Sequence, residues 1–387
     1  MRTLVVSDLH LGSASRADLL RRPELRGVLF DALEDVDRLV LLGDVLELRH
    51  GPRREALEGA RAFFEDLGRA FAGREVVLLA GNHDHALIEP WLERRRELID
   101  PGPLALEQRF AAQDASPTVA TLADWAAPAR LSVAYPGLWV RPDVYATHGH
   151  YLDCHLTVPT MERLGIAAVG RMQRRPPLSF ERPEDYEAVT APVFAWIDAM
   201  AQQARSGATL NGDSTVRAWR TLGGDSNHRP SRRSTALRNR VLTGAFPLVV
   251  AALNRAGLGT FHADISPPEL RRAGLRAMGE VAAALGLGEA PLHIVFGHTH
   301  RCGPLSGDEP GEWRTPGGAQ LLNSGCWTFD DYFLNGQTSG NPYWPGGAVL
   351  VQDEGPPLLK RLLCEHSHAE LAPGHARPAD PRPSRSR

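Results

Sequence analysis

The chain has 387 residues, of which 43% are hydrophobic and 23% are charged, and its formal net charge is -3. This length supports one large α/β domain with insertions, or two domains, with a substantial core and no need of disulfides. The charge balance excludes a general attraction to nucleic acid or to an anionic membrane.

The N-terminal stretch MRTLVVSDLHLG has only a short apolar run before an aspartate, so we interpret it as a first strand and not as a signal peptide. The longest apolar run, residues 244–253, contains Pro247 and is about half as long as a membrane span. The four cysteines lie far apart and form no CxxC pair, which favours a reducing compartment. We therefore expect a soluble cytoplasmic protein.

Five apolar runs of four to six residues are predicted as buried strands, because they contain β-branched residues and have glycine or polar flanks. In chain order they are TLVVS before Asp8, RLVLLG before Asp44, VVLLAG before Asn82, VYAT before His148 and HIVFG before His298. Helical patterns at residues 23–33 and 55–71 separate the first three runs. This alternation indicates crossover units and a largely parallel sheet, in which ligands gather at the carboxyl ends of the strands.

Each predicted strand ends in side chains that bind metals. The motifs are Asp8-Leu9-His10, Gly43-Asp44, Gly81-Asn82-His83-Asp84, His148-Gly149-His150 and Gly297-His298-Thr299-His300. Any one motif occurs by chance, and Asp8 or Asp44 alone is better explained as a helix N-cap. Together they predict a site for divalent cations, whose usual ligands are carboxylate, imidazole and amide oxygen. The ligands are too many for one ion, so we expect two ions that share a carboxylate, an arrangement that clamps phosphoryl groups.

The order of the motifs, DxH, GD, GNHD, H and GHTH, resembles the calcineurin-like metallophosphoesterase superfamily over residues 1–150 and about 290–330. The resemblance implies an α/β fold, a four-layer α/β/β/α sandwich of two mixed sheets, with the metal-binding loops at one edge. It also implies two divalent metal ions, for which manganese is our first expectation and iron, zinc or cobalt are alternatives. The implied ligands are Asp8, His10, Asp44 and His300 for one ion, and Asp44, Asn82, His148 and His298 for the other.

The resemblance further implies a reaction in which a hydroxide shared by the ions attacks phosphorus and His83 protonates the leaving oxygen. In relatives whose second motif reads GDxxD, the last Asp orients this histidine, whereas here Glu47, one methylene longer, stands at that position. Either Glu47 or Asp84 is therefore predicted to orient His83. Two residues beside the motifs, His150 and Arg301, are predicted substrate contacts, and a satisfied core histidine is the equal alternative for His150.

Particular residues disfavour some branches of the superfamily. The sequence GDVLELR lacks the GDxVDRG of protein Ser/Thr phosphatases, and Glu47 replaces the tyrosine ligand of purple acid phosphatases. The segments SDLHLGS and GHTHR resemble the UDP-2,3-diacylglucosamine hydrolase branch, but that branch typically has GNRD where this chain has His83, so its lipid substrate is not carried over. We predict hydrolysis of a small phosphodiester or pyrophosphate. A phosphomonoesterase, a nuclease with the same site and a non-catalytic metal-binding scaffold are the alternatives.

The phosphoesterase core is predicted at residues 1–150 and 290–365. Residues 151–289 lack these motifs, and helical patterns within them, at residues 185–204, 235–256 and 268–285, predict a mainly helical cap that selects the substrate. The terminal residues 373–387 are predicted to be a disordered tail because almost none is apolar.

The segment from Arg217 to Arg240 holds seven arginines and one acid. Arginine suits phosphate or an anionic surface, so peripheral contact with the inner face of the membrane is a further prediction, although most charge runs are merely solvated. A small phosphoester is the expected partner, nucleic acid is disfavoured, and the sequence leaves the oligomeric state open.

Overall fold

The computed structural model describes residues 1–173, 179–203, 250–256, 261–262, 267–290, 292–334 and 337–373. In this part of the chain, ten strands form one sheet in the order β10-β9-β1-β2-β3-β5-β6-β7-β8, with β4 paired to β5. The strands are β1 (Thr3–Val6), β2 (Arg38–Leu42), β3 (Glu75–Leu79), β4 (Glu107–Ala111), β5 (Arg130–Arg141), β6 (Val144–Thr147), β7 (His293–Phe296), β8 (Gln320–Asn323), β9 (Gly347–Val351) and β10 (Leu358–Arg361). The five strands predicted from the sequence are confirmed as β1, β2, β3, β6 and β7.

The α-helices are α1 (Pro23–Asp31), α2 (Arg53–Ala70), α3 (Glu89–Glu97), α4 (Ala112–Ala115), α5 (Pro117–Ala126), α6 (Met161–Met172), α7 (Pro183–Gln203), α10 (Pro267–Ala284), α11 (Asp331–Leu334) and α12 (His368–Leu371). Short 3₁₀ helices are η1 (Leu19–Arg21), η2 (His85–Leu87), η3 (His150–Cys154) and η4 (Pro310–Trp313). Helices α1 and α2 connect β1, β2 and β3, which pair in parallel, so the predicted crossover units are confirmed.

Strand β5 joins the two halves of the sheet. Its first residues, from Arg130 to Val133, pair in parallel with β3, and its last residues, from Gly137 to Arg141, pair antiparallel with β6. The mixed α/β class is confirmed, and β5 links the two halves into one hydrogen-bonded sheet. The four-layer stacking stays a prediction.

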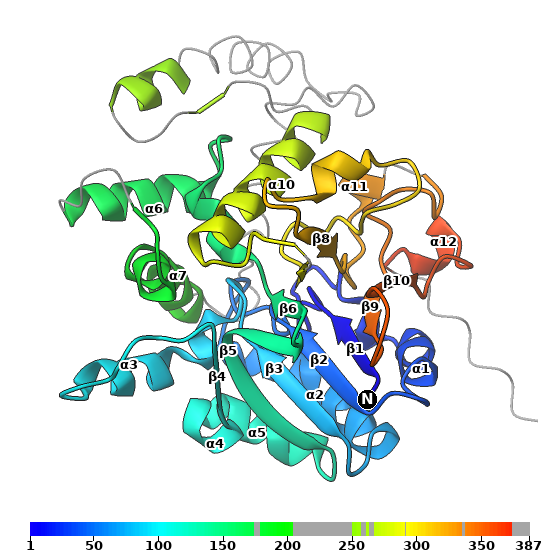
Figure 1. Cartoon of the computed structure of the whole chain (residues 1–387). Helices are drawn as coiled ribbons and strands as arrows, with labels where there is room; N and C mark the ends of the chain where they lie inside the picture. The colour runs from blue at the N-terminus through cyan, green and yellow to red at the C-terminus, as the bar shows by residue number, and fades with distance from the viewer. Residues whose placement is uncertain are drawn as a thin grey trace, which may run out of the picture.

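Three hydrophobic clusters show which faces the sheet buries. One contains Val5, Val40 and Val77 from β1 to β3 together with Val144 and Val295 from β6 and β7, so the two halves of the sheet pack against each other. A second lies between β1 to β3 and the helices α1, α2 and α5. The third lies between β6 to β8 and the helices α6, α7 and α10. Figure 1 shows these last helices on one side of the sheet and α2, α4 and α5 on the other.

The helices α7 and α10 confirm two of the three helical patterns expected between residues 151 and 289. Both contribute to the same hydrophobic cluster as β6, β7 and β8, so they form part of the core beside the site. The division into core and cap stays a proposal. The arginine-rich segment from Arg217 to Arg240 and residues 374–387 of the predicted tail lie outside the described residues.

Within the described residues, no helix is both long and apolar enough to cross a membrane.

Candidate metal centre

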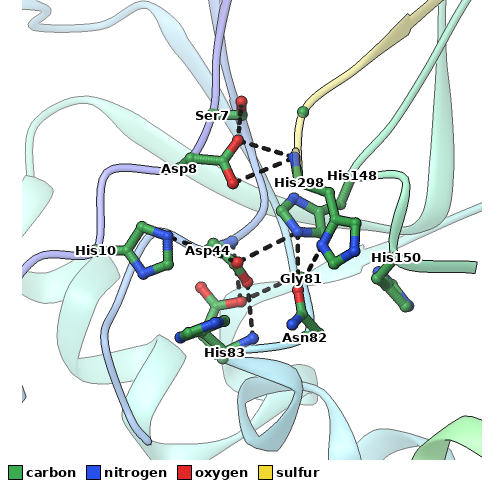
Figure 2. A network of polar contacts seen from close by, with 12 residues as sticks. Ser7, Asp8, His10, Asp44, Gly81, Asn82, His83, His148, His150 and His298 are labelled. Carbon is green, nitrogen blue, oxygen red and sulfur yellow. Dashed lines mark hydrogen bonds and ion pairs between the residues drawn. The ribbon is translucent and has the colours of Figure 1, made fainter. Parts of the chain in front are cut away.

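The structure brings all seven predicted metal ligands to one edge of the sheet, where they follow the carboxyl ends of β1, β2, β3, β6 and β7. Figure 2 shows the labelled members of this set, from separate strands, pointing toward one another. Two groups of three residues correspond to the two predicted ion positions, and within each group the ligand atoms lie within 4.8 Å of one another. One group is Asp8, His10 and His300, and the other is Asp44, His148 and His298. A third group joins His10, Asp44 and His83. Asp44 therefore lies between the two positions, as a bridging carboxylate must.

The backbone at the ligands is held in a rare conformation. Among the described residues, six residues other than glycine have positive φ, and five of them are predicted ligands: Asp8 (56°), His10 (46°), Asp44 (50°), His298 (66°) and His300 (58°). Such a conformation costs about 1–3 kcal/mol per residue and persists only where the surroundings enforce it, mostly at functional sites. The strain is therefore independent support for the site.

Glycines allow the ligand side chains to approach the neighbouring loops. Gly43 has φ +84°, and a Cβ atom there would lie 2.5 Å from Cγ of the His148 ring. A Cβ at Gly81 would lie 2.3 Å from Asp44 Oδ1. Any larger residue at either position would displace a ligand.

At the first ion position, ring nitrogens of His10 and His300 face each other. His10 Nδ1 lies 2.9 Å from Glu47 Oε2 and donates to it, so His10 Nε2 is left as the ligand atom. This nitrogen is 3.1 Å from His300 Nε2 and 3.7 Å from Asp44 Oδ2. His300 Nε2 is in turn 3.3 Å from Asp8 Oδ1.

At the second position, two hydrogen bonds orient the histidines. His148 Nδ1 donates to the carbonyl oxygen of Leu42 at 2.9 Å, which leaves Nε2 facing Asp44 Oδ2 at 3.3 Å. His298 Nε2 donates to Asp153 Oδ1 at 3.1 Å, which leaves Nδ1 as its ligand atom. A carboxylate or carbonyl behind the imidazole is the usual support of a metal-binding histidine.

The Asn82 amide provides the test of whether these residues fit a cation. Its Oδ1 points at His148 Nε2 (3.2 Å) and His298 Nδ1 (3.0 Å), atoms that carry lone pairs when the histidines act as ligands. If the amide were rotated by half a turn, its nitrogen would donate to Asp44 Oδ2 and to both rings. In either orientation, the amide, two imidazoles and the Asp44 carboxylate converge on one point, and these are the donor groups that divalent cations accept. The residues therefore fit a divalent ion.

Without a cation, protons neutralise the cluster. Burial lowers the pKa of His148, but the carboxylates of Asp44 and Asp8 outweigh it and raise that pKa to about 9. Burial raises the pKa of Asp44, but the charges of His148 and His83 hold it well below its ordinary value. Metal ligands must be deprotonated, so a bound cation displaces these protons.

Among the described residues, the carboxylate hydrogen-bonded to the His83 ring is Glu47. His83 Nδ1 lies 3.0 Å from Glu47 Oε1 and 2.9 Å from Glu47 Oε2, so the longer side chain reaches the ring. The ring lines the cavity at the metal centre, and its Nε2 is the nitrogen left for a substrate.

Asp84 has a different role. Its carboxylate accepts hydrogen bonds from the backbone N–H groups of Gly81 (2.7 Å), Asp44 (3.2 Å), Val45 (2.7 Å) and Leu46 (3.2 Å). The Asp84 carboxylate therefore connects the loop at Asp44 with the loop at Gly81. Among the described contacts, it has no hydrogen bond to the His83 ring. We assign it to positioning of the loops.

The two predicted substrate contacts differ in position. Arg301 lines the cavity, but its guanidinium pairs with Asp308 and lies 5.1 Å from the centre of the Trp313 ring. His150 is only 2% exposed and is absent from the cavity wall, and its Nε2 lies 3.4 Å from the Tyr135 hydroxyl. Figure 2 shows it beside the ligands and outside their network of contacts. His150 is therefore a buried neighbour of the ligands, its Nδ1 has no hydrogen-bond partner among the described residues, and its contact with substrate stays a prediction.

Sequence reasoning missed Asp153, which holds His298 and is 3% exposed. It also missed Ser7, whose Oγ donates to Asp8 Oδ2 and lies 2.7 Å from the Ser324 hydroxyl. Asp153 lies in the segment without recognisable motifs, so no sequence pattern identifies it as a contact of a ligand. Ser7 directly precedes the ligand Asp8, and this position is the only sequence feature that could have indicated its role.

Comparisons with known proteins agree with this geometry. Residues 1–182 match the family model of the calcineurin-like phosphoesterases. None of the curated proteins compared with the chain matches it. Among solved structures, the chain is similar to a dimetal phosphatase from Danio rerio, with 13% identity over 93% of this chain and 98% of that chain and a TM-score of 0.32. The calcineurin-like phosphoesterase match thus lies in residues 1–182, and the chain is a metal-dependent phosphoric ester hydrolase, for which that family implies two divalent ions.

Proposed function

We propose that the protein hydrolyses a phosphodiester or a pyrophosphate. The observation that supports this most directly is the position of Asp44, which is shared between two groups of potential ligands and lies beside His83. When bound there, two divalent ions, manganese in our proposal, supply Lewis acidity toward the phosphoryl group and a nucleophile derived from water at neutral pH. The residues of the chain position these ions and handle the proton.

His83 is the proposed general acid. As the P–O ester bond breaks, the leaving oxygen takes a proton from His83 Nε2, and the proton released by the attacking water restores the imidazolium. Glu47 accepts from Nδ1 at 2.9 Å, which fixes the tautomer and stabilises the charged ring. A histidine suits this role because it titrates near physiological pH.

The charges around the cavity favour a diester over a monoester. A monoester carries about -1.5 to -2 charges near neutral pH, and a diester has no second proton to lose. Both described arginines in the cavity wall are already paired, Arg271 with Glu312 at 2.9 Å and Arg301 with Asp308. The arginines in the described part of the wall thus offer little to neutralise a second charge.

The test compares bis-p-nitrophenyl phosphate with p-nitrophenyl phosphate as substrates of metal-stripped protein before and after manganese is restored. We expect turnover only with metal, and faster turnover of the diester. In an Asp44→Asn variant, turnover should fall by at least about 100-fold because the bridging charge is lost. His262→Ala, a substitution at an exposed histidine outside the cavity, is the control. Metal-independent turnover, or an Asp44→Asn variant as active as the wild type, would refute the proposal.

A further inference from the structure

A cavity of about 640 Å³ opens beside the metal centre, with the ligands at one end. Its walls come from the segment after η3, from α10 and from the segment around α11. Apolar side chains predominate beyond the ligands: Leu152, Leu156, Val158, Leu270, Leu275, Phe296, Phe329, Phe333 and Tyr343. A cavity of this size holds an organic group of the dimensions of a drug-sized ligand.

Part of the apolar wall lies outside the hydrophobic clusters of the described residues, and Leu270 is an example. It lies on α10, is only partly buried and lines the cavity. Among the described residues, it belongs to none of the three hydrophobic clusters. Leu156 also lines the cavity while packing at the border of the cluster under α7 and α10. An apolar ligand would cover the exposed surface of these side chains.

The charged residues of the wall do not favour an anionic ligand group. The described arginines, Arg271 and Arg301, are ion-paired as described above. Acidic side chains also line the cavity: Glu162, which pairs with Arg49 at 3.0 Å, Asp331, which pairs with His368 at 3.0 Å, and Asp330. A second phosphate or a polyphosphate placed there would meet carboxylates and paired guanidinium groups.

We propose that this cavity binds the non-leaving ester group of a phosphodiester, and that this group is apolar and uncharged, an alkyl chain or an aromatic ring and not a nucleoside or a second phosphate. This inference rests on the proposed function and narrows it. The phosphoryl group lies at the ligands, and the organic group extends along Leu156 and Leu270.

The first test uses diesters that share p-nitrophenol as the leaving group, so that only the bound group differs: methyl, hexyl, phenyl and thymidine p-nitrophenyl phosphates. Each buried methylene is worth about threefold to fourfold, so we expect the kcat/KM of the hexyl or phenyl ester to exceed that of the methyl ester by at least about 10-fold. If the hexyl ester has the larger kcat/KM, the bound group is an alkyl chain; if the phenyl ester has it, the bound group is an aromatic ring. Equal values across the series, or a preference for the thymidine ester, would overturn the proposal.

The second test measures binding and does not depend on turnover. Calorimetric titration of the manganese-loaded protein should show hexylphosphonate or phenylphosphonate binding at least about 10-fold more tightly than methylphosphonate. If no diester is hydrolysed and this difference is present, the proposed function fails and the apolar site stands. If hydrolysis occurs and neither the binding nor the rate depends on the organic group, the apolar site fails and the function stands.

A pair of matched variants tests whether the organic group binds along Leu270. In Leu270→Asn, the ratio of hexyl to methyl kcat/KM should fall by about fivefold or more because an amide replaces apolar surface in the wall. Leu98→Asn is the control, since Leu98 is 58% exposed at the end of α3 and does not line the cavity. An unchanged ratio in Leu270→Asn together with an unchanged calorimetric preference would contradict the placement of the organic group.

Discussion

Glu47 Oε2 lies 2.9 Å from His83 Nδ1, and the same oxygen lies 2.9 Å from His10 Nδ1. One buried carboxylate therefore orients both a predicted metal ligand and the proposed general acid, each with its Nε2 turned toward the site. Burial raises the pKa of Glu47, but the surrounding histidines hold it well below its ordinary value, so it remains an acceptor.

Glu47→Gln should therefore impair two functions together. The neutral amide supports the histidines less well, and we expect metal affinity and kcat/KM each to fall by about 10- to 100-fold. Glu47→Asp, which has the residue found in relatives with GDxxD, should restore part of both. Metal titration and kinetics of the two variants check this. Equal metal affinity in wild type and Glu47→Gln would contradict the shared role.

His83→Ala should have an effect that depends on the leaving group. An alkoxide needs a proton to leave, whereas p-nitrophenolate is stable without one, so the loss of kcat should approach about 10²- to 10⁴-fold for an alkyl leaving group and be much smaller for p-nitrophenol. The measurement compares dialkyl and p-nitrophenyl diesters in both proteins. An equal loss for both leaving groups would mean that His83 acts by binding and not by protonation.

The metal-free protein should lose stability as the pH rises above neutrality. The folded-state pKa of His148 is about 9, above the ordinary 6.5, so its protonation stabilises the fold fully below pH 6.5 and this contribution disappears by about pH 9. The order of magnitude is up to about 3 kcal/mol for this one group. Denaturant unfolding with a chelator, between these pH values, should show the decline.

The manganese-loaded protein is the control for this pH dependence. A bound cation replaces the proton on His148, so its unfolding free energy should not decline over the same interval. Parallel curves for the metal-free and loaded proteins would show that His148 is not a ligand.

Gly43→Ala should destroy the second ion position. The new methyl group would lie 2.5 Å from the His148 ring, and the backbone there has φ +84°. Gly73→Ala is the control that separates backbone strain from the steric clash. Gly73 also has a positive φ, +71°, but nothing lies within 4 Å of the added Cβ. We expect both variants to lose about 1 kcal/mol of stability from the backbone, and only Gly43→Ala to lose metal affinity. Equal metal affinity in both variants would show that the close approach is unimportant.

The sequence was sufficient to predict the ligand strands because each is a short β-branched run that ends directly in its ligands, as Val6 and Asp8 illustrate. Local patterns also indicated α7 and α10. Strand β5 was not predicted because Pro136 and Gly137 interrupt its apolar residues, and its identity depends on pairing with β3 and β6.

The remainder of the site depends on tertiary contacts that leave no local pattern. Asp153 reaches His298 across 145 positions of the chain, and Leu270 lines the cavity from a helix that shares no motif with the metal centre. The role of Glu47 was left open because one methylene decides whether it reaches His83, and only the geometry of the two loops fixes that distance.

The central claim is that Asp44 serves two ions at once. The most direct test titrates manganese into metal-stripped protein and measures bound metal per chain together with hydrolysis of bis-p-nitrophenyl phosphate. We predict no turnover without metal and full turnover only when about two ions are bound per chain. Full turnover with a single bound ion, or metal binding at both positions without hydrolysis of any diester, would contradict the account.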